Sequence, residues 1–201
     1  LVIVDESHQA RSELSLEMLE NFNPCFVLDL TATPKKESNI ISYVDAVQLK
    51  NEHMVKLPVI VYNRDSQAEV LTDAIDLRNK LEEIANAEYA KTGKYIRPIA
   101  LFQAQPKGKE DATTFEKLRD KLVDAGIPAE QIAIRTADVN ELKNVELMSL
   151  SCPIRYIITV NALKEGWDCP FAYILASLAN KTSQVDVEQI LGRILRLHHT
   201  S

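Results

Sequence analysis

Short apolar runs alternate with stretches of helical periodicity at the start of the chain. Residues 1–4 and 25–30 are largely apolar runs of strand length, and residues 11–21 between them have the spacing of a helix. Continuous rather than alternating apolar strands are typical of parallel sheets that helices cover on both faces. The pattern therefore predicts a strand, a helix and a second strand of a parallel α/β sheet.

The pattern changes before the middle of the chain. Pro58 interrupts the apolar run 55–62, which favours an edge strand or a crossing segment over a central strand. We therefore place a domain boundary between residues 56 and 57. A long amphipathic helix is expected over residues 67–90, and Gly93 lies where it should stop.

Strand and helix patterns continue to alternate through the rest of the chain. The expected strands are residues 99–102, 131–135, 155–160 and 172–177, and the expected helices are residues 112–125 and 185–197. Residues 57–201 thus predict a nearly complete parallel α/β domain, which follows a shorter α/β piece formed by residues 1–56.

Composition and charge exclude several classes of protein. The chain is 46% hydrophobic and 26% charged, as in ordinary globular proteins. Its net charge of -6 provides no global basic field, although local Lys and Arg can still hold a phosphate backbone. Three scattered cysteines without metal-ligand spacing favour a reduced, cytoplasmic protein. No apolar run has the length of a membrane span, and no signal peptide opens the chain.

Polar residues with the chemistry of a nucleotide site follow the first two expected strands. Asp5 and Glu6 stand where the first strand ends, where an Asp can hold Mg²⁺ through water and a Glu can activate an attacking water. Thr31 and Thr33 follow the second strand, and their hydroxyls can hydrogen-bond to that acidic pair. The alternative is an ordinary polar strand exit, followed by hydroxyls that form a turn with Pro34 or cap a helix.

A third cluster lies in the loop after the expected strand 155–160. Gly166 permits a close backbone approach, and Asp168 can bind a ribose hydroxyl or an arginine. A loop with Gly and Asp is also an ordinary turn, and Trp167 fits a packed anchor better than a base-stacking platform.

A fourth cluster lies on the expected helix 185–197. Gln189, Arg193 and Arg196 fall within an arc of roughly 60°, opposite the apolar face of that helix. Gly192 leaves room beside them, so the cluster suits contact with a phosphate. The alternative is a solvated polar face.

The four clusters, in this order, resemble the motor core of superfamily-two helicases and translocases. They match motif II (Asp5-Glu6-Ser7-His8), motif III (Thr31-Ala32-Thr33), motif V (Gly166-Trp167-Asp168) and motif VI (Gln189 to Arg196). The resemblance implies two RecA-like lobes, each a parallel sheet flanked by helices. Residues 1–56 would be the C-terminal part of lobe 1, with motifs II and III, and residues 57–201 would be lobe 2, with motifs IV, V and VI.

Two stretches look like the restriction (Res) subunit of type III restriction-modification enzymes. They are residues 162–170, Ala-Leu-Lys-Glu-Gly-Trp-Asp-Cys-Pro, and residues 188–193, Glu-Gln-Ile-Leu-Gly-Arg. Residues 99–106 stand where that family carries motif IV. This resemblance implies an ATP-driven DNA translocase or helicase that uses Mg²⁺, acts on duplex DNA and works with a modification or specificity subunit.

The resemblance also implies a role for each matched residue. Asp5 would coordinate Mg²⁺ through water, and Glu6 would activate the attacking water. Arg193 and Arg196 would be arginine fingers that stabilise charge on the transferred phosphoryl group. The residues implied in coupling between the lobes are His8, Thr31, Thr33 and Gln189. Those implied in nucleotide binding are Gly166, Asp168 and Gly192.

The chain departs from the motor pattern because it has no G-x-x-x-x-G-K-[ST] phosphate loop. Gly93-Lys94 and Gly108-Lys109 do not qualify, since Glu88 and Gln103 stand where the first loop glycine should be. We expect that loop in a lobe 1 segment before Leu1, and we expect the 201-residue chain by itself to hydrolyse no ATP. The alternatives are a repair-type or CRISPR-associated superfamily-two helicase, and a binding module that keeps the fold without the chemistry.

Overall fold

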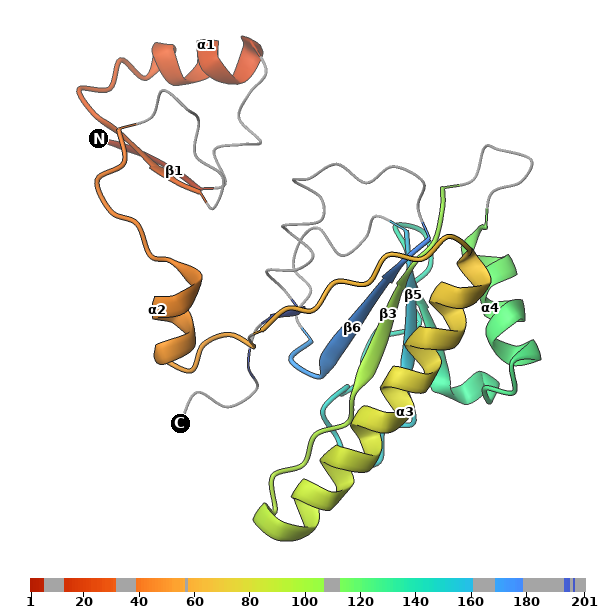
Figure 1. Cartoon of the computed structure of the whole chain (residues 1–201). Helices are drawn as coiled ribbons and strands as arrows, with labels where there is room; N and C mark the ends of the chain where they lie inside the picture. The colour runs from red at the N-terminus through yellow and green to blue at the C-terminus, as the bar shows by residue number, and fades with distance from the viewer. Residues whose placement is uncertain are drawn as a thin grey trace. The chain divides into compact units, whose positions relative to one another are not determined.

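The computed structural model of the chain describes residues 1–5, 13–31, 39–56, 58–106, 113–160, 169–178, 194–195 and 197. The chain divides into two compact units, Leu1–Asp45 (unit 1) and Ala46–Ser201 (unit 2) (Figure 1). Each unit contains its own sheet of parallel strands, and each is described by itself.

Unit 1 contains one strand, helix, strand motif. Its elements are β1 Val2–Asp5, α1 Glu13–Asn21 and β2 Val27–Leu30. The two strands pair in parallel, from Val2 opposite Val27 to Asp5 opposite Leu30. Shortly after α1, Asn23 takes up a left-handed backbone with φ 43°, which Asn tolerates better than most residues. This order of elements is the one that the apolar pattern predicts.

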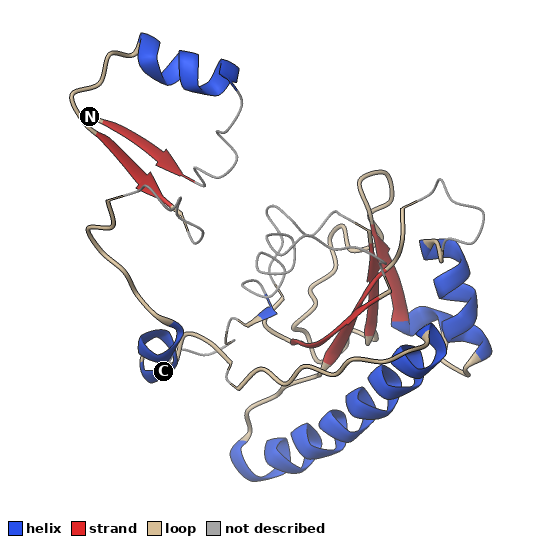
Figure 2. Ribbon diagram, turned by 45° about the horizontal axis from the view of Figure 1, so that its top comes forward, coloured by secondary structure: helices blue, strands red, loops and turns tan. Residues whose placement is uncertain are grey.

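Unit 2 is built on a parallel sheet, whose strands are red in Figure 2. The sheet has four strands in the order β4-β5-β3-β6. Its strands are β3 Ile99–Gln103, β4 Ile132–Arg135, β5 Tyr156–Thr159 and β6 Ala172–Ser177. β3 and β5 lie in the middle of the sheet, and every residue of both strands is buried. Central parallel strands are covered on both faces, which explains why these runs are continuously apolar.

The helices of unit 2 are α2 Ala46–Asn51, α3 Gln67–Thr92 and α4 Phe115–Asp124, with a short 3-10 turn, η1 Ala129–Gln131. Local signals set both ends of α3. Ser66 Oγ accepts a hydrogen bond from the Glu69 N–H at the start of the helix. Gly93 ends it in a left-handed conformation, with φ 71°, and its N–H donates to the Tyr89 carbonyl.

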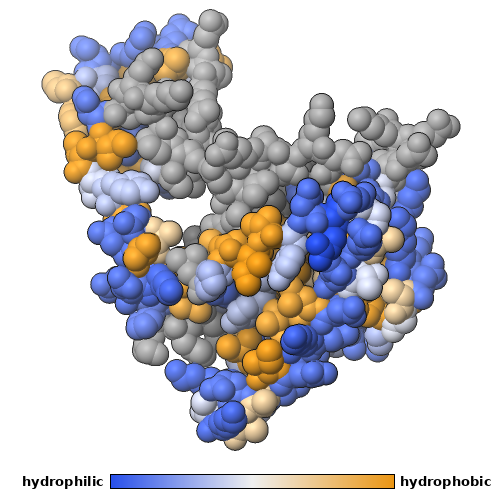
Figure 3. All heavy atoms as spheres, in the orientation of Figure 1, coloured by the Kyte–Doolittle hydropathy of each residue, from blue (hydrophilic) through white to orange (hydrophobic). Residues whose placement is uncertain are grey.

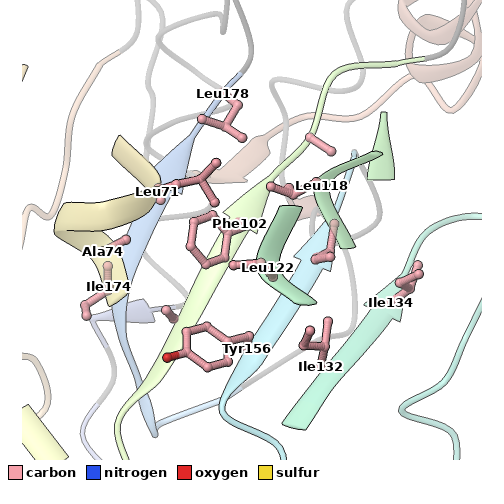
Figure 4. Packing of buried hydrophobic residues seen from close by; sticks show 14 residues of the cluster. Leu71, Ala74, Phe102, Leu118, Leu122, Ile132, Ile134, Tyr156, Ile174 and Leu178 are labelled. Atoms are coloured by element: carbon pink, nitrogen blue, oxygen red, sulfur yellow. The ribbon is translucent and has the colours of Figure 1, made fainter. Parts of the chain in front are cut away.

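Two hydrophobic clusters form the core of unit 2, one on each face of the sheet, because successive strand residues point to opposite faces. On one face, Leu71 and Ala74 of α3 and Leu118 and Leu122 of α4 pack around Phe102 of β3 (Figure 4). The cluster on the other face consists of Ile99, Leu101, Ile157, Cys169, Phe171, Ala172 and Ile194.

The predicted fold class is confirmed, since both sheets are parallel and helices flank them, as in a RecA-like fold. The division between the units falls after Asp45, earlier than the expected boundary between residues 56 and 57. Assignment of the two units to motor lobes 1 and 2 stays a prediction. The expected helix 185–197 lies outside the described residues except for residues 194, 195 and 197.

Hydrophobic side chains reach the surface in both units (Figure 3). In unit 2 they include an exposed run from Val59 to Tyr62, in a segment between Pro58 and α3 that forms neither strand nor helix. The residues that follow Pro58 thus form no edge strand, which is one of the two arrangements that the sequence favours. Among the helices that the structure describes, none is long and apolar enough to cross a membrane.

Candidate functional site

The carboxyl ends of β1 and β2 bring two of the predicted site residues to the same edge of a sheet. Asp5 is the last residue of β1, and its register partner Leu30 is the last residue of β2. Thr31 follows Leu30 directly, so the acidic cluster and the hydroxyl cluster begin on neighbouring strand ends. In parallel α/β sheets, ligands bind outside this edge.

The chemistry of Asp5 fits a water-mediated Mg²⁺ contact. Its side chain is exposed to solvent at the strand end, while Thr31 is half-buried. Mg²⁺ usually keeps several water ligands and needs one or two carboxylates rather than an all-protein cage. Among the described residues, no group of three or more His, Cys, Asp or Glu side chains is placed to hold a metal ion.

Most of the predicted site lies outside the described residues. The structure places Asp5 and Thr31, as given above. The predicted residues that lie outside it are Glu6, His8, Thr33, Gly166, Asp168, Gln189, Gly192, Arg193 and Arg196. Their roles stay predictions.

A polar network at the carboxyl ends of the unit 2 strands was not singled out by sequence reasoning. Gln103 ends β3, and its Oε1 accepts a hydrogen bond of 2.9 Å from the Ser177 hydroxyl at the end of β6. Gln105 Nε2 donates to the Leu178 carbonyl at 2.9 Å, and Gln105 Oε1 accepts from the Thr113 N–H at 2.9 Å. The network therefore ties the ends of β3 and β6 to the segment that leads into α4.

The hydroxyl of Thr159 lies at the end of β5, next to β3. Its Oγ1 is fully buried and has no hydrogen-bond partner among the described residues. A buried polar group without a partner costs about 1–3 kcal/mol, so such a group calls for a specific explanation. The only signal in the sequence is that Gln103, Gln105 and Thr159 are polar residues at or just beyond the ends of apolar runs.

Charged residues gather elsewhere in unit 2, around the residues that precede β3 and β5. The guanidinium of Arg97, which is buried, donates to the Ile154 carbonyl at 2.9 Å and to the Ser149 carbonyl at 2.8 Å. Glu82 pairs with Arg155 at 2.7 Å and also with Arg78. Burial is the main cause that lowers the pKa of Arg78 and of Arg155. These contacts fix the segments that precede β3 and β5, so we assign them a structural role. The candidate sites are the edges at the carboxyl ends of the strands.

Comparison with known proteins supports a relationship at the N-terminal end of the chain. A family model for the type III restriction enzyme, res subunit, matches residues 1–36. A search of curated proteins finds no match for the chain. The matched stretch is 36 of the 201 residues and contains the Asp5 and Thr31 clusters, both of the strands of unit 1 and α1. The similarity to a family of helicase-like ATPases therefore rests on this N-terminal stretch.

Proposed function

We propose that this chain is part of an ATP-driven DNA motor, and that its full-length parent is the restriction subunit of a type III restriction-modification system. The observation that carries the proposal is the coincidence of the matched residues 1–36 with the parallel β1-α1-β2 motif. That motif presents Asp5 and Thr31 at adjacent strand ends, where ATP-using α/β proteins place their catalytic groups.

In this proposal Asp5 and Glu6 provide the acidic half of the ATP site. Asp5 holds Mg²⁺ through water, and Glu6 orients and deprotonates the attacking water. Arg193 and Arg196 provide the basic half, because an arginine that stabilises charge on the transferred phosphoryl group is worth about 10³–10⁵ in rate. Gly166, Asp168 and Gly192 contact the nucleotide. Coupling between the lobes is assigned to His8, Thr31, Thr33 and Gln189.

The proposed partners follow from the same relationship. We infer that the parent polypeptide acts on duplex DNA, works with a modification or specificity subunit, and carries a phosphate loop in a segment of lobe 1. The 201 residues themselves contain no such loop. The chain alone therefore lacks a cradle for the β- and γ-phosphates and hydrolyses no ATP.

Mg²⁺-dependent ATP turnover, with and without duplex DNA, tests this proposal in the chain and in its parent. We expect no turnover from the chain and DNA-stimulated turnover from the parent. Glu6→Gln should lower kcat of the parent by at least about 10²-fold, since it removes the general base. Glu17→Gln, on the exposed surface of α1, is the matched control and should leave kcat unchanged.

Each failure of this experiment has a distinct meaning. Robust DNA-stimulated turnover by the 201-residue chain would overturn its inactivity. Unchanged turnover in Glu6→Gln, together with unchanged Glu17→Gln, would show that Glu6 is not the general base. No turnover from the parent itself would favour a binding module without catalysis. Turnover without a linked nuclease domain in the parent would favour a repair-type or CRISPR-associated helicase over the restriction subunit.

A further inference from the structure

An open cavity of about 610 Å³ lies in unit 2, within the range of roughly 300–1,000 Å³ that small-molecule sites occupy. Its lining includes Lys50 of α2, His53 in the segment that follows α2, and Tyr173 of β6. Tyr173 is the second residue of β6, whereas Ser177 is its last. The cavity therefore adjoins the start of β6 and lies apart from the polar network at the carboxyl ends of the unit 2 strands.

Backbone hydrogen bonds between distant segments hold two walls of this cavity together. The Lys56 N–H donates to the Leu195 carbonyl at 2.6 Å, and the Leu197 N–H donates to the Met54 carbonyl at 3.1 Å. Lys56 and Leu197 both line the cavity. The segment that follows α2 is thus paired with residues near the C-terminus.

The Lys56 side chain ties the same walls to the core of the unit. Its Nζ donates to the Ile194 carbonyl at 2.6 Å and to the Ala172 carbonyl at 2.8 Å, and it lies 4.3 Å from the centre of the Tyr173 ring. Ile194 and Ala172 are buried in one hydrophobic cluster. Walls that are fixed before binding lower the entropy lost when a ligand binds. Because the Lys56 ammonium bonds to the protein itself, we assign recognition of a ligand to other residues.

The end of α2 places His53 in a left-handed backbone conformation. The His53 N–H donates to the Lys50 carbonyl at 2.9 Å, and the Met54 N–H donates to the Leu49 carbonyl at 2.9 Å, which is the Schellman arrangement. Glycine is usual at the position of His53, where φ is 54°, because a side chain there costs stability. The His53 side chain lines the cavity. A backbone outlier at this place points to a function for the imidazole.

The polar part of the lining favours an anion over a cation. Among the residues that the structure describes, neither the Lys50 ammonium nor the His53 imidazole has a hydrogen-bond or ion-pair partner. No Asp or Glu belongs to the described lining. The carbonyls of Leu49 and Lys50 already accept hydrogen bonds at the end of α2, so they are not free to hold a cation.

The remaining wall is mostly apolar. Val55, Leu197 and the ring of Tyr173 are half-buried there. A ligand body that packs against them gains by removing apolar surface from water. An apolar wall with a few placed polar groups is the usual composition of a small-molecule site.

We propose that this cavity binds a small organic anion, in which a phosphate or carboxylate group is attached to an aromatic or aliphatic body. Lys50 and His53 donate to the anionic group, and Tyr173, Val55 and Leu197 contact the body. Both kinds of anion present oxygens that accept from an ammonium and from an imidazole N–H. The proposal does not rest on the proposed function, because it uses none of the residues assigned to the ATP site.

Phenyl phosphate and benzoate test the proposal on the 201-residue chain, since each joins an anion to an aromatic ring. We expect the better of these probes to bind with a Kd of about 1 mM or below. Inorganic phosphate and benzyl alcohol each lack one half of this chemistry and should bind at least about tenfold more weakly. Amide chemical shifts should change at His53 and Tyr173 and stay constant at Gln103, at the carboxyl end of β3.

Single substitutions connect the binding to the two cationic side chains. Lys50→Met and His53→Gly should each weaken the better probe by about 5- to 10-fold. Lys143→Met, at an exposed position outside the described lining, is the matched control and should leave Kd unchanged. His53→Gly should keep or raise the Tm, because glycine suits a left-handed backbone, so its weaker binding is separated from any loss of fold.

Three results would overturn the proposal. One is the absence of binding by both aromatic anions at about 10 mM. Another is inorganic phosphate that binds as tightly as phenyl phosphate, which would mean an adventitious ion only. The third is an equal loss of affinity in Lys143→Met and Lys50→Met, which would mean unspecific charge attraction. ATP turnover enters none of these measurements, so their failure leaves the proposed function as it stands.

Discussion

The two sheets of this protein are built from the same kind of strand but differ in how those strands are covered. In unit 2, every residue of β3 and β5 is buried, and hydrophobic clusters lie on both faces of the sheet. In unit 1, β1 and β2 pair with each other, and no described residue of the unit is buried. Ile3 of β1 is 57% exposed, whereas Leu101 of β3 is 0% exposed.

The comparison shows that the sequence pattern that predicts a strand is not what makes the strand stable. Apolar runs are sufficient to predict β1 and β2, yet a parallel strand is stable when both of its faces are covered. Burial contributes roughly 25 cal/mol for each Å² of apolar surface removed from water, and an exposed side chain contributes little of this. The core of unit 2 should therefore be much more stable than unit 1.

Matched leucine truncations test the comparison with the largest expected effect. Leu101→Ala in β3 should lower the unfolding free energy of unit 2 by about 2–5 kcal/mol, because it leaves a cavity in a closed core. Leu30→Ala in β2, where the leucine is 49% exposed, should cost under about 1 kcal/mol. Urea unfolding read by amide exchange in each unit measures both. Equal costs would mean that unit 1 has a core of its own.

Alkaline pH should destabilise the second unit by an intermediate amount. Burial raises the pKa of the Cys169 thiol from 9.0 to about 11, and backbone hydrogen bonds from Phe171 and Ala172, with smaller effects of Lys56 and Arg97, oppose that rise only in part. The thiol in the unfolded chain ionises first, so this stabilisation is complete below pH 9 and is lost as pH rises through 11. The loss is about 2–3 kcal/mol.

Unfolding free energies of unit 2 at pH 8, 9.5 and 11 measure this loss. Cys169→Ala should flatten the pH dependence, and Cys25→Ala, at an exposed position in unit 1, should leave it as it is. Some dependence will remain in both variants, because burial also raises the pKa of Tyr156 and of Tyr173. The same slope in Cys169→Ala as in the unchanged chain would show that the thiol is not the cause.

The smallest expected effect concerns the Thr159 hydroxyl at the end of β5. Thr159→Val should raise the unfolding free energy of unit 2 by about 1 kcal/mol, since it removes a buried donor that has no partner among the described residues. Thr113→Val is the matched substitution and should lower it by about 1 kcal/mol, because Thr113 Oγ1 donates to Gln67 Oε1 at 2.6 Å. Thermal unfolding ranks the two variants, and a destabilised Thr159→Val would mean that its hydroxyl is partnered.

The predicted domain boundary and the division into compact units fall at different places in the chain. The interrupted run around Pro58 looks like a boundary in sequence, so we expected it between residues 56 and 57. The compact units divide after Asp45. Residues 54 and 56 hydrogen-bond to residues near the C-terminus, and a pairing across 138 residues leaves no trace in the local pattern.

The sequence likewise identified some residues of the candidate sites and missed others. Asp5 and Thr31 were identified from their position after apolar runs, and the pairing of Asp5 with Leu30 places both clusters at one edge. The polar network of Gln103 and Gln105 and the contacts of Lys56 were missed. Isolated glutamines and lysines are common on protein surfaces, and nothing in their neighbours along the chain distinguishes those that make such contacts.

The α/β class, the parallel strands and the ends of α3 follow from residues close together in the chain. Apolar runs, the Ser66 cap and Gly93 act through their immediate neighbours, so reading along the sequence is sufficient for them. The strand order β4-β5-β3-β6, the burial of Thr159 and the Lys56 contacts needed the folded molecule. These features depend on which distant segments pack together. The packing of distant segments is determined by the free energy of the whole core, which no local stretch of sequence reveals.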